Sequence, residues 1–139
     1  MKPVGGLTFG VSIAMFHTLI AEDNPTFRQS LRELLNRRFP FMAIEEAADG
    51  EEAMDHGTAS HHDLVFVDIK MPGHNGLDVT RAIRSGDRSA VICVVTSYDL
   101  PEYRDAAQDC GADHFIVKDE STEATVVSLV ESILAHPPA

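Results

Sequence analysis

Five short apolar runs alternate with five segments of helical character, and this alternation restricts the folds open to the chain. The runs are rich in β-branched residues and have the length of buried strands. They cover Phe16–Ala21, Met42–Ala47, Leu64–Val67, residues 90–95 and His114–Val117. Strands that alternate with helices pair in parallel through right-handed crossovers. The sequence therefore predicts an α/β fold built on a single, doubly wound, five-stranded parallel sheet.

Turn residues and apolar periodicity place a helix after each run. Asn24 and Pro25 suit the N-cap and the first position of a helix that Pro40 stops. The second helix is expected to end at Gly57. The five helices are predicted between Asn24 and Pro40 and at residues 51–56, 77–84, 101–109 and 120–135.

Length and charge narrow the class of protein. The 139 residues suit one domain, expected at residues 15–139, with residues 1–14 as an appendage broken by glycines. A formal net charge of −11 disfavours direct nucleic-acid binding and contact with an anionic membrane surface. No apolar run is long enough to span a membrane. Two cysteines are too few for a disulfide framework, which favours a reducing, cytoplasmic compartment.

Polar residues follow four of the five runs. Glu22 and Asp23 follow the first, Asp68 the third and Lys118 the fifth, while Thr96 follows the fourth. The carboxyl ends of parallel strands meet at one edge of a sheet. Three carboxylates gathered there repel one another unless a cation is present, and Mg²⁺ suits such oxygen ligands. Because Asp forms aspartyl-phosphate in phosphoryl transfer, Asp68 is a candidate nucleophile, with Lys118 and Thr96 as partners for the phosphoryl oxygens.

These residues, together with Met71, Pro72, Gly73 and Gly76, resemble the motifs of the response-regulator receiver domain of two-component signalling. The resemblance covers about residues 15–135 and implies the flavodoxin-like, CheY-like (βα)5 fold. It implies that Asp68 accepts a phosphoryl group from a sensor histidine kinase or a histidine phosphotransfer protein. It also implies that Mg²⁺ is held by Glu22, Asp23, Asp68 and the backbone carbonyl of Lys70. A protein of this kind is a signalling domain, not a turnover enzyme.

The same resemblance assigns further roles. Thr96 and Phe115 would form the switch that changes a protein-interaction surface after phosphorylation. Lys70 and Tyr98, each two residues beyond a site residue, would tune the lifetime of the phosphorylated state. Lys118 is followed by Asp119 where many members have proline, as in receivers that precede a helix-turn-helix output. A stand-alone receiver, the receiver part of a longer regulator and a homodimer all stay open.

Two other functions fit parts of the pattern. A binding module with this fold would be regulated by protein contacts and not by phosphate. A Mg²⁺-dependent phosphatase would use Asp68 as nucleophile, but that class has a second Asp where this chain has Lys70. Away from the predicted edge, His61 and His62 are expected to be a surface pair.

Overall fold

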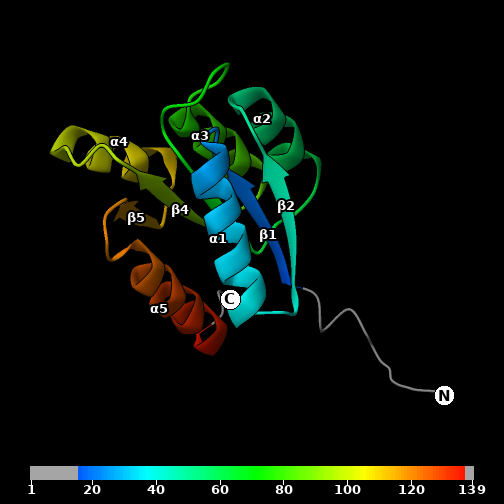
Figure 1. Cartoon of the computed structure of the whole chain (residues 1–139). Coiled ribbons are helices and arrows are strands. Elements are labelled where there is room, and N and C mark those ends of the chain that lie inside the picture. Colours follow the sequence, from blue (N-terminus) through cyan, green and yellow to red (C-terminus); the bar gives the residue numbers. More distant parts are fainter. Residues whose placement is uncertain (1–15, 137–139) are drawn as a thin grey trace.

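A five-stranded sheet forms the centre of the computed structural model, which describes residues 16–136 (Figure 1). Residues 1–14, the expected appendage, lie outside the described residues. Every predicted apolar run becomes a strand, although the fourth begins one residue later than expected. The strands are β1 (Phe16–Ala21), β2 (Met42–Ala47), β3 (Leu64–Val67), β4 (Val91–Thr96) and β5 (His114–Val117).

All strand pairs are parallel, and the order across the sheet is β2-β1-β3-β4-β5. The chain thus moves to one side of β1 for β2 and to the other side for β3. The point between β1 and β3 is the topological switch point, outside which open α/β sheets bind ligands. The predicted doubly wound fold class is therefore confirmed.

Five helices follow the strands in turn. Asn24 caps α1 by accepting the backbone N–H groups of Thr26 and Phe27, as its sequence position predicts. Gly57 does not end the second helix, which continues to Ala59. The helices are α1 (Pro25–Arg38), α2 (Gly50–Ala59), α3 (Gly76–Gly86), α4 (Pro101–Cys110) and α5 (Thr122–Ala135).

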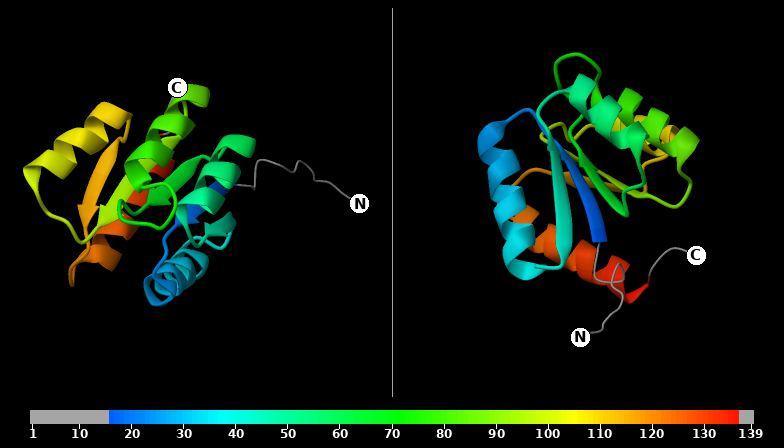
Figure 2. Two further views of the ribbon diagram at one scale, coloured as in Figure 1. Left: turned by 90° about the horizontal axis from the view of Figure 1, so that it is seen from above. Right: turned by 90° about the vertical axis from the view of Figure 1, so that its right-hand side faces the viewer.

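Packing explains why Gly57 stays helical. A Cβ atom at this position would lie 2.6 Å from Cδ1 of Ile83 on α3. Gly57 is therefore a close-approach point between two helices, and the helix-stop interpretation of this glycine is wrong. The contact lets α2 and α3 lie side by side on one face of the sheet (Figure 2).

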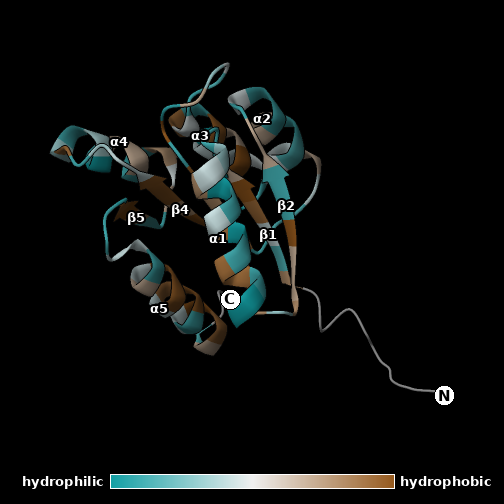
Figure 3. Ribbon diagram, viewed as in Figure 1, coloured by the Kyte–Doolittle hydropathy of each residue, from teal (hydrophilic) through white to brown (hydrophobic). Residues whose placement is uncertain are grey.

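Two apolar layers cover the sheet. Helices α1 and α5 lie on one face, and α2, α3 and α4 lie on the other (Figures 1 and 2). Each face has its own core, with Phe66 and Leu35 in the first and Val65 and Val79 in the second. The strands are apolar along most of their length, whereas the helices turn hydrophilic residues outward (Figure 3). No helix among residues 16–136 is long and apolar enough to cross a membrane.

The turn between β3 and α3 is shaped by two glycines. Gly73 has φ +83°, a left-handed conformation that side chains disfavour. Gly76 approaches the backbone so closely that a Cβ would lie 2.0 Å from the carbonyl oxygen of Asp68. Its N–H donates to the carbonyl of Ile69 over 2.8 Å. This turn fixes the backbone directly after Asp68.

Candidate functional site

Backbone hydrogen bonds hold the polar strand ends in register at one edge of the sheet. The N–H of Asp68 donates to the carbonyl of Ala21, at the end of β1, over 3.0 Å. The N–H of Lys118 donates to the carbonyl of Thr96, at the end of β4, over 2.8 Å. The residues that follow β1, β3 and β5 are therefore placed by the sheet itself and not by flexible loops.

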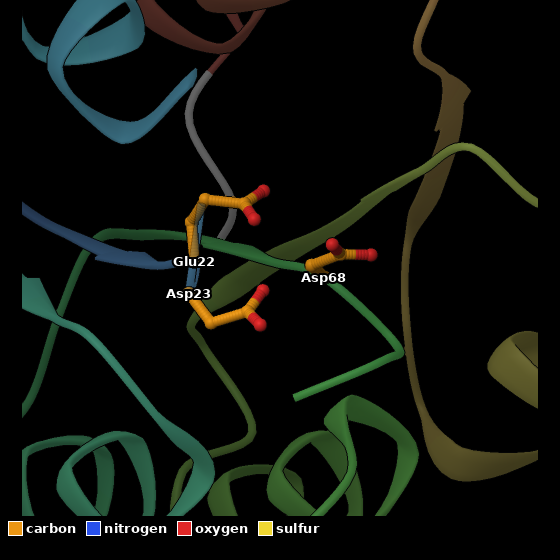
Figure 4. Close-up of side chains that lie close together, drawn as sticks. All are labelled: Glu22, Asp23 and Asp68. Carbon is orange, nitrogen blue, oxygen red and sulfur yellow. The ribbon is translucent and has the colours of Figure 1, made fainter. Parts of the chain in front are cut away.

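Three carboxylates gather at the switch point. Glu22 and Asp23 leave the end of β1, and their side chains extend toward the side on which Asp68 lies (Figure 4). One oxygen of each carboxylate lies within 4.8 Å of the other two. Glu22 and Asp68 are buried, while Asp23 is exposed to solvent. The sequence prediction that these three side chains lie together is thus met by their placement.

Lys118 pairs with the two buried acids. Its Nζ lies 2.8 Å from Oε1 of Glu22 and 3.2 Å from Oδ2 of Asp68. The same ammonium lies over the ring of Phe27 on α1, 4.3 Å from its centroid. A charged amine held by two carboxylates and a ring face has little freedom to leave. The helical spacing of Phe27 in the sequence indicates a core position and carries no sign of this contact.

Burial and pairing shift the pKa values of this pair. Burial raises the pKa of Glu22, against the hydrogen bond from Lys118. Burial alone would lower the pKa of Lys118, but the hydrogen bond to Glu22 and the charges of Asp68 and Glu22 raise it. The ammonium is therefore fully charged at neutral pH. For Glu22, the effect of burial on the pKa thus outweighs the opposing effect of Lys118.

The two oxygens of the Asp68 carboxylate differ in their contacts within residues 16–136. Among the described residues, Oδ1 of Asp68 is buried and accepts no hydrogen bond, whereas Oδ2 contacts Lys118. A buried carboxylate oxygen without a partner is costly. A hard dication with oxygen ligands removes this cost and the repulsion within the acidic cluster. The donor set therefore fits Mg²⁺.

The two predicted switch residues lie on neighbouring strands. Thr96 is fully buried at the end of β4, which pairs with β3, the strand that Asp68 follows. Its Oγ1 accepts the N–H of Tyr98 over 3.4 Å. Phe115 on β5 is half-buried, with the guanidinium of Arg104 from α4 over its ring at 4.6 Å. The structure thus links Phe115 to α4 through Arg104.

The ammonium of Lys70 contacts two tyrosine rings. Its Nζ lies over the rings of Tyr98 and Tyr103, 5.2 and 5.8 Å from their centroids. Among the described residues, the cation paired with Asp68 is Lys118. The sequence carries no signal for the contact of Tyr103 with Lys70, because one aromatic residue on a helix is ordinarily a packing residue.

His61 and His62 do not form a surface pair. His61 is exposed and contacts Asp63 and Asp87, but His62 is 5% exposed and its Nε2 lies 2.8 Å from Oε1 of Glu45. The two rings have separate partners, Asp63 and Asp87 for His61 and Glu45 for His62. The expectation for His62 is therefore wrong.

Fold and site together define a class of protein, an open α/β sheet with a buried acid, a lysine and an acidic cluster at its switch point. A family model described as the response regulator receiver domain matches residues 18–130. The chain therefore belongs to the response regulator receiver domain family.

Related sequences and structures agree with this membership. The nitrate/nitrite response regulator protein NarP of Escherichia coli (strain K12) is 32% identical over 120 residues, covering 86% of this chain and 54% of NarP. The transcriptional regulatory protein PdtaR of Mycobacterium tuberculosis is 38% identical over 100 residues, covering 72% of this chain and 48% of PdtaR. The chain spans about half the length of these curated relatives.

Two solved structures share the fold at similar identity. A two-component response regulator of the LuxR family from Aurantimonas sp. SI85-9A1 has a TM-score of 0.76 and 33% identity, over 88% of this chain and 87% of that one. The response regulator protein TrrA from Thermotoga maritima, in complex with Mg²⁺-BeF, has a TM-score of 0.73 and 32% identity. That match covers 84% of this chain and 98% of TrrA.

Proposed function

We propose that Asp68 of this receiver domain accepts a phosphoryl group from a phosphohistidine, and that the modified domain presents a changed surface to a protein partner. The observation that carries the proposal is the state of the Asp68 carboxylate. It is buried at the switch point, one oxygen contacts Lys118, and the other has no partner among the described residues. Glu22 and Asp23 each place one carboxylate oxygen within 4.8 Å of an oxygen of Asp68.

The chemistry is an exchange of one bond for another at phosphorus. A carboxylate oxygen of Asp68 attacks the phosphorus, the bond from phosphorus to the donor imidazole nitrogen breaks, and that imidazole leaves with the bonding electron pair. The transferred group carries its charge on three oxygens, so positioned cations and donors do most of the work. Lys118 is already beside Asp68, and Thr96 ends the neighbouring strand.

Glu22, Asp23, Asp68 and the backbone carbonyl of Lys70 would hold Mg²⁺ in this proposal. When bound, the ion neutralises charge on the phosphoryl oxygens and on the acidic cluster. Asp23 is exposed and open to a direct contact, whereas Glu22 is occupied by Lys118 and by the N–H of Asn24. That TrrA was obtained in complex with Mg²⁺-BeF supports the assignment.

Thr96 and Phe115 would carry the signal outward. Phosphorylation adds about 1.5 to 2 negative charges at one spot and three strong acceptor oxygens. A movement of Thr96 toward them would free space beside Phe115, which already contacts Arg104 of α4. Lys70 and Tyr98 would tune how long the modification lasts. The partner that supplies the phosphoryl group would be a sensor histidine kinase or a histidine phosphotransfer protein in the cytoplasm.

One incubation separates this function from the two alternatives. The chain is treated with acetyl phosphate and Mg²⁺, and intact mass is followed for a gain of about 80 Da, the mass of a phosphoryl group. We expect the gain in the wild type and in Asp63→Asn, a control acid outside the site, but not in Asp68→Asn. Absence of modification with every donor would favour a binding module. Repeated turnover of an unrelated phosphate ester would favour a phosphatase.

A further inference from the structure

Two tyrosines hold the ammonium of Lys70. Its Nζ lies 5.2 Å from the ring centroid of Tyr98 and 5.8 Å from that of Tyr103. The two rings are 5.7 Å apart and inclined by 52°. A cation within about 6 Å of an aromatic ring is attracted by the negative ring face. Lys70, Tyr98 and Tyr103 therefore form one interacting group, named here the tyrosine clamp.

The clamp connects two loops that start at the site. Lys70 lies two residues after Asp68 in the loop after β3, and Tyr98 lies two residues after Thr96 in the loop after β4. The N–H of Tyr98 donates to the Oγ1 of Thr96 over 3.4 Å, which ties this loop to the strand end. The clamp thus joins the loop that follows Asp68 to the loop that follows Thr96.

Tyr103 is the anchored member of the clamp. Lys70 is exposed and Tyr98 is 42% exposed, so neither is fixed by packing alone. Tyr103 is half-buried on α4 and packs against the core that contains Val94 and Ala107. An exposed lysine loses rotamer freedom when it is held, and a rigid ring already fixed by a helix lowers the cost of holding it.

We propose that Tyr103 is a positioning residue that prolongs the phosphorylated state of Asp68, an inference that rests on the proposed function. It holds Lys70 and Tyr98 together across the approach to the phosphoryl group. In the loss of that group, a water oxygen attacks phosphorus and the bond from phosphorus to the Asp68 oxygen breaks. The products are the free carboxylate and inorganic phosphate, which shares the protons of the water with solvent. A closed clamp obstructs the approach of this water.

The test follows the decay of the phosphorylated chain after the donor is removed. Tyr103→Leu keeps apolar bulk but removes the ring, and we expect decay to become about two- to five-fold faster, as loss of an exposed cation–π contact allows. Tyr103→Phe keeps the ring and is expected to decay at the wild-type rate. Phe41→Leu is the matched control, because Phe41 also contacts neighbouring rings but lies before β2, at the opposite end of the strands.

A double-mutant cycle and a spectroscopic readout complete the test. Because both residues act through one contact, the combined effect of Lys70→Met and Tyr103→Leu on the logarithm of the decay rate is expected to be less than the sum. In the unphosphorylated chain, the ring currents shift the side-chain methylene proton resonances of Lys70, and this shift is expected to fall in Tyr103→Leu and persist in Tyr103→Phe.

The outcomes separate this inference from the function beneath it. Absence of phosphorylation in the wild type would overturn both proposals. Equal decay rates in the phosphorylated wild type and Tyr103→Leu would overturn the role of Tyr103 alone. Faster decay that Tyr103→Phe fails to restore would overturn it as well, since the ring and not the hydroxyl is assigned the role.

Discussion

Replacing Lys118 by methionine tests how the acidic cluster is balanced. The ammonium is the shared partner of Glu22 and Asp68, whose side chains are 3% and 9% exposed. Removing one partner of a fully buried ion pair costs about 3–5 kcal/mol, because a buried charge is left uncompensated. Lys118 itself is 17% exposed and Asp23 beside it faces solvent, so water relieves part of this cost. We expect Lys118→Met to lower the free energy of unfolding by about 1–3 kcal/mol without metal.

Two conditions should reduce this loss. In the proposed site Mg²⁺ would compensate the same carboxylates, so we expect it to stabilise Lys118→Met more than the wild type. Lowering the pH should also help, because the pKa of Glu22 is raised by burial and removal of the lysine takes away groups that oppose this rise. Protonation of Glu22 then removes one of the uncompensated charges.

Urea unfolding followed by circular dichroism, with EDTA or with Mg²⁺, measures both effects. Arg81→Met is the control, because the Arg81–Asp78 pair is 65% and 50% exposed and such a pair contributes only about 0–1 kcal/mol. Equal stability of Lys118→Met and the wild type in EDTA would show that Lys118 does not compensate the buried carboxylates. Greater stabilisation of the wild type by Mg²⁺ would also contradict this role of Lys118.

Three further changes test other parts of the structure. Gly76→Ala should lower the free energy of unfolding in urea by about 1–3 kcal/mol, because its Cβ would lie 2.0 Å from a backbone oxygen. Gly86→Ala, whose Cβ would meet nothing within 4 Å, should not destabilise the fold. Equal effects of the two substitutions would contradict the close approach at Gly76. Asp23→Asn should change the free energy of unfolding in EDTA by no more than about 0.5 kcal/mol, because Asp23 is exposed. The same substitution should diminish the rise in melting temperature that Mg²⁺ produces. An unchanged rise would exclude Asp23 as a ligand. The hydrogen bond to Asp87 raises the pKa of His61, and that of Asp87, against its burial, is lowered to about 2. We therefore expect His61→Gln to lower the free energy of unfolding most between pH 3.8 and pH 6.5. This loss should become smaller as the pH rises through the folded pKa of His61, and also as the pH falls toward about 2. A loss that does not vary with pH in unfolding titrations would contradict the pairing.

Local sequence patterns predict the fold because each strand and helix has a recognisable pattern within its own residues. The apolar run at Leu64–Val67 reads as a strand without knowledge of its neighbours, and Asn24 with Pro25 marks a helix start. Parallel pairing then follows from the alternation of elements. The meeting of Glu22, Asp23 and Asp68 at one edge follows in turn, since it needs only the direction of the strands.

Local sequence patterns do not predict contacts between distant segments of the chain. Gly57 looked like a helix end, but the side chain of Ile83 from another helix decides its role. His62 looked exposed, but a carboxylate on β2 provides a partner at depth. Spacing puts Lys70 two residues after Asp68, but it does not reveal that the Lys70 ammonium lies over Tyr103, which is on a different element. Spacing places a backbone, whereas side-chain partners are set by tertiary packing.

The central claim is that Asp68 is the residue that takes the phosphoryl group. Borohydride reduces an aspartyl-phosphate to homoserine, so peptide mass spectrometry after treatment with acetyl phosphate, Mg²⁺ and borohydride identifies the modified position. We expect homoserine at residue 68 and unchanged Glu22 and Asp23. The homoserine signal should be lost when Mg²⁺ is removed by EDTA. Homoserine at another acidic residue, or none in a sample whose mass shows phosphorylation, would contradict the claim.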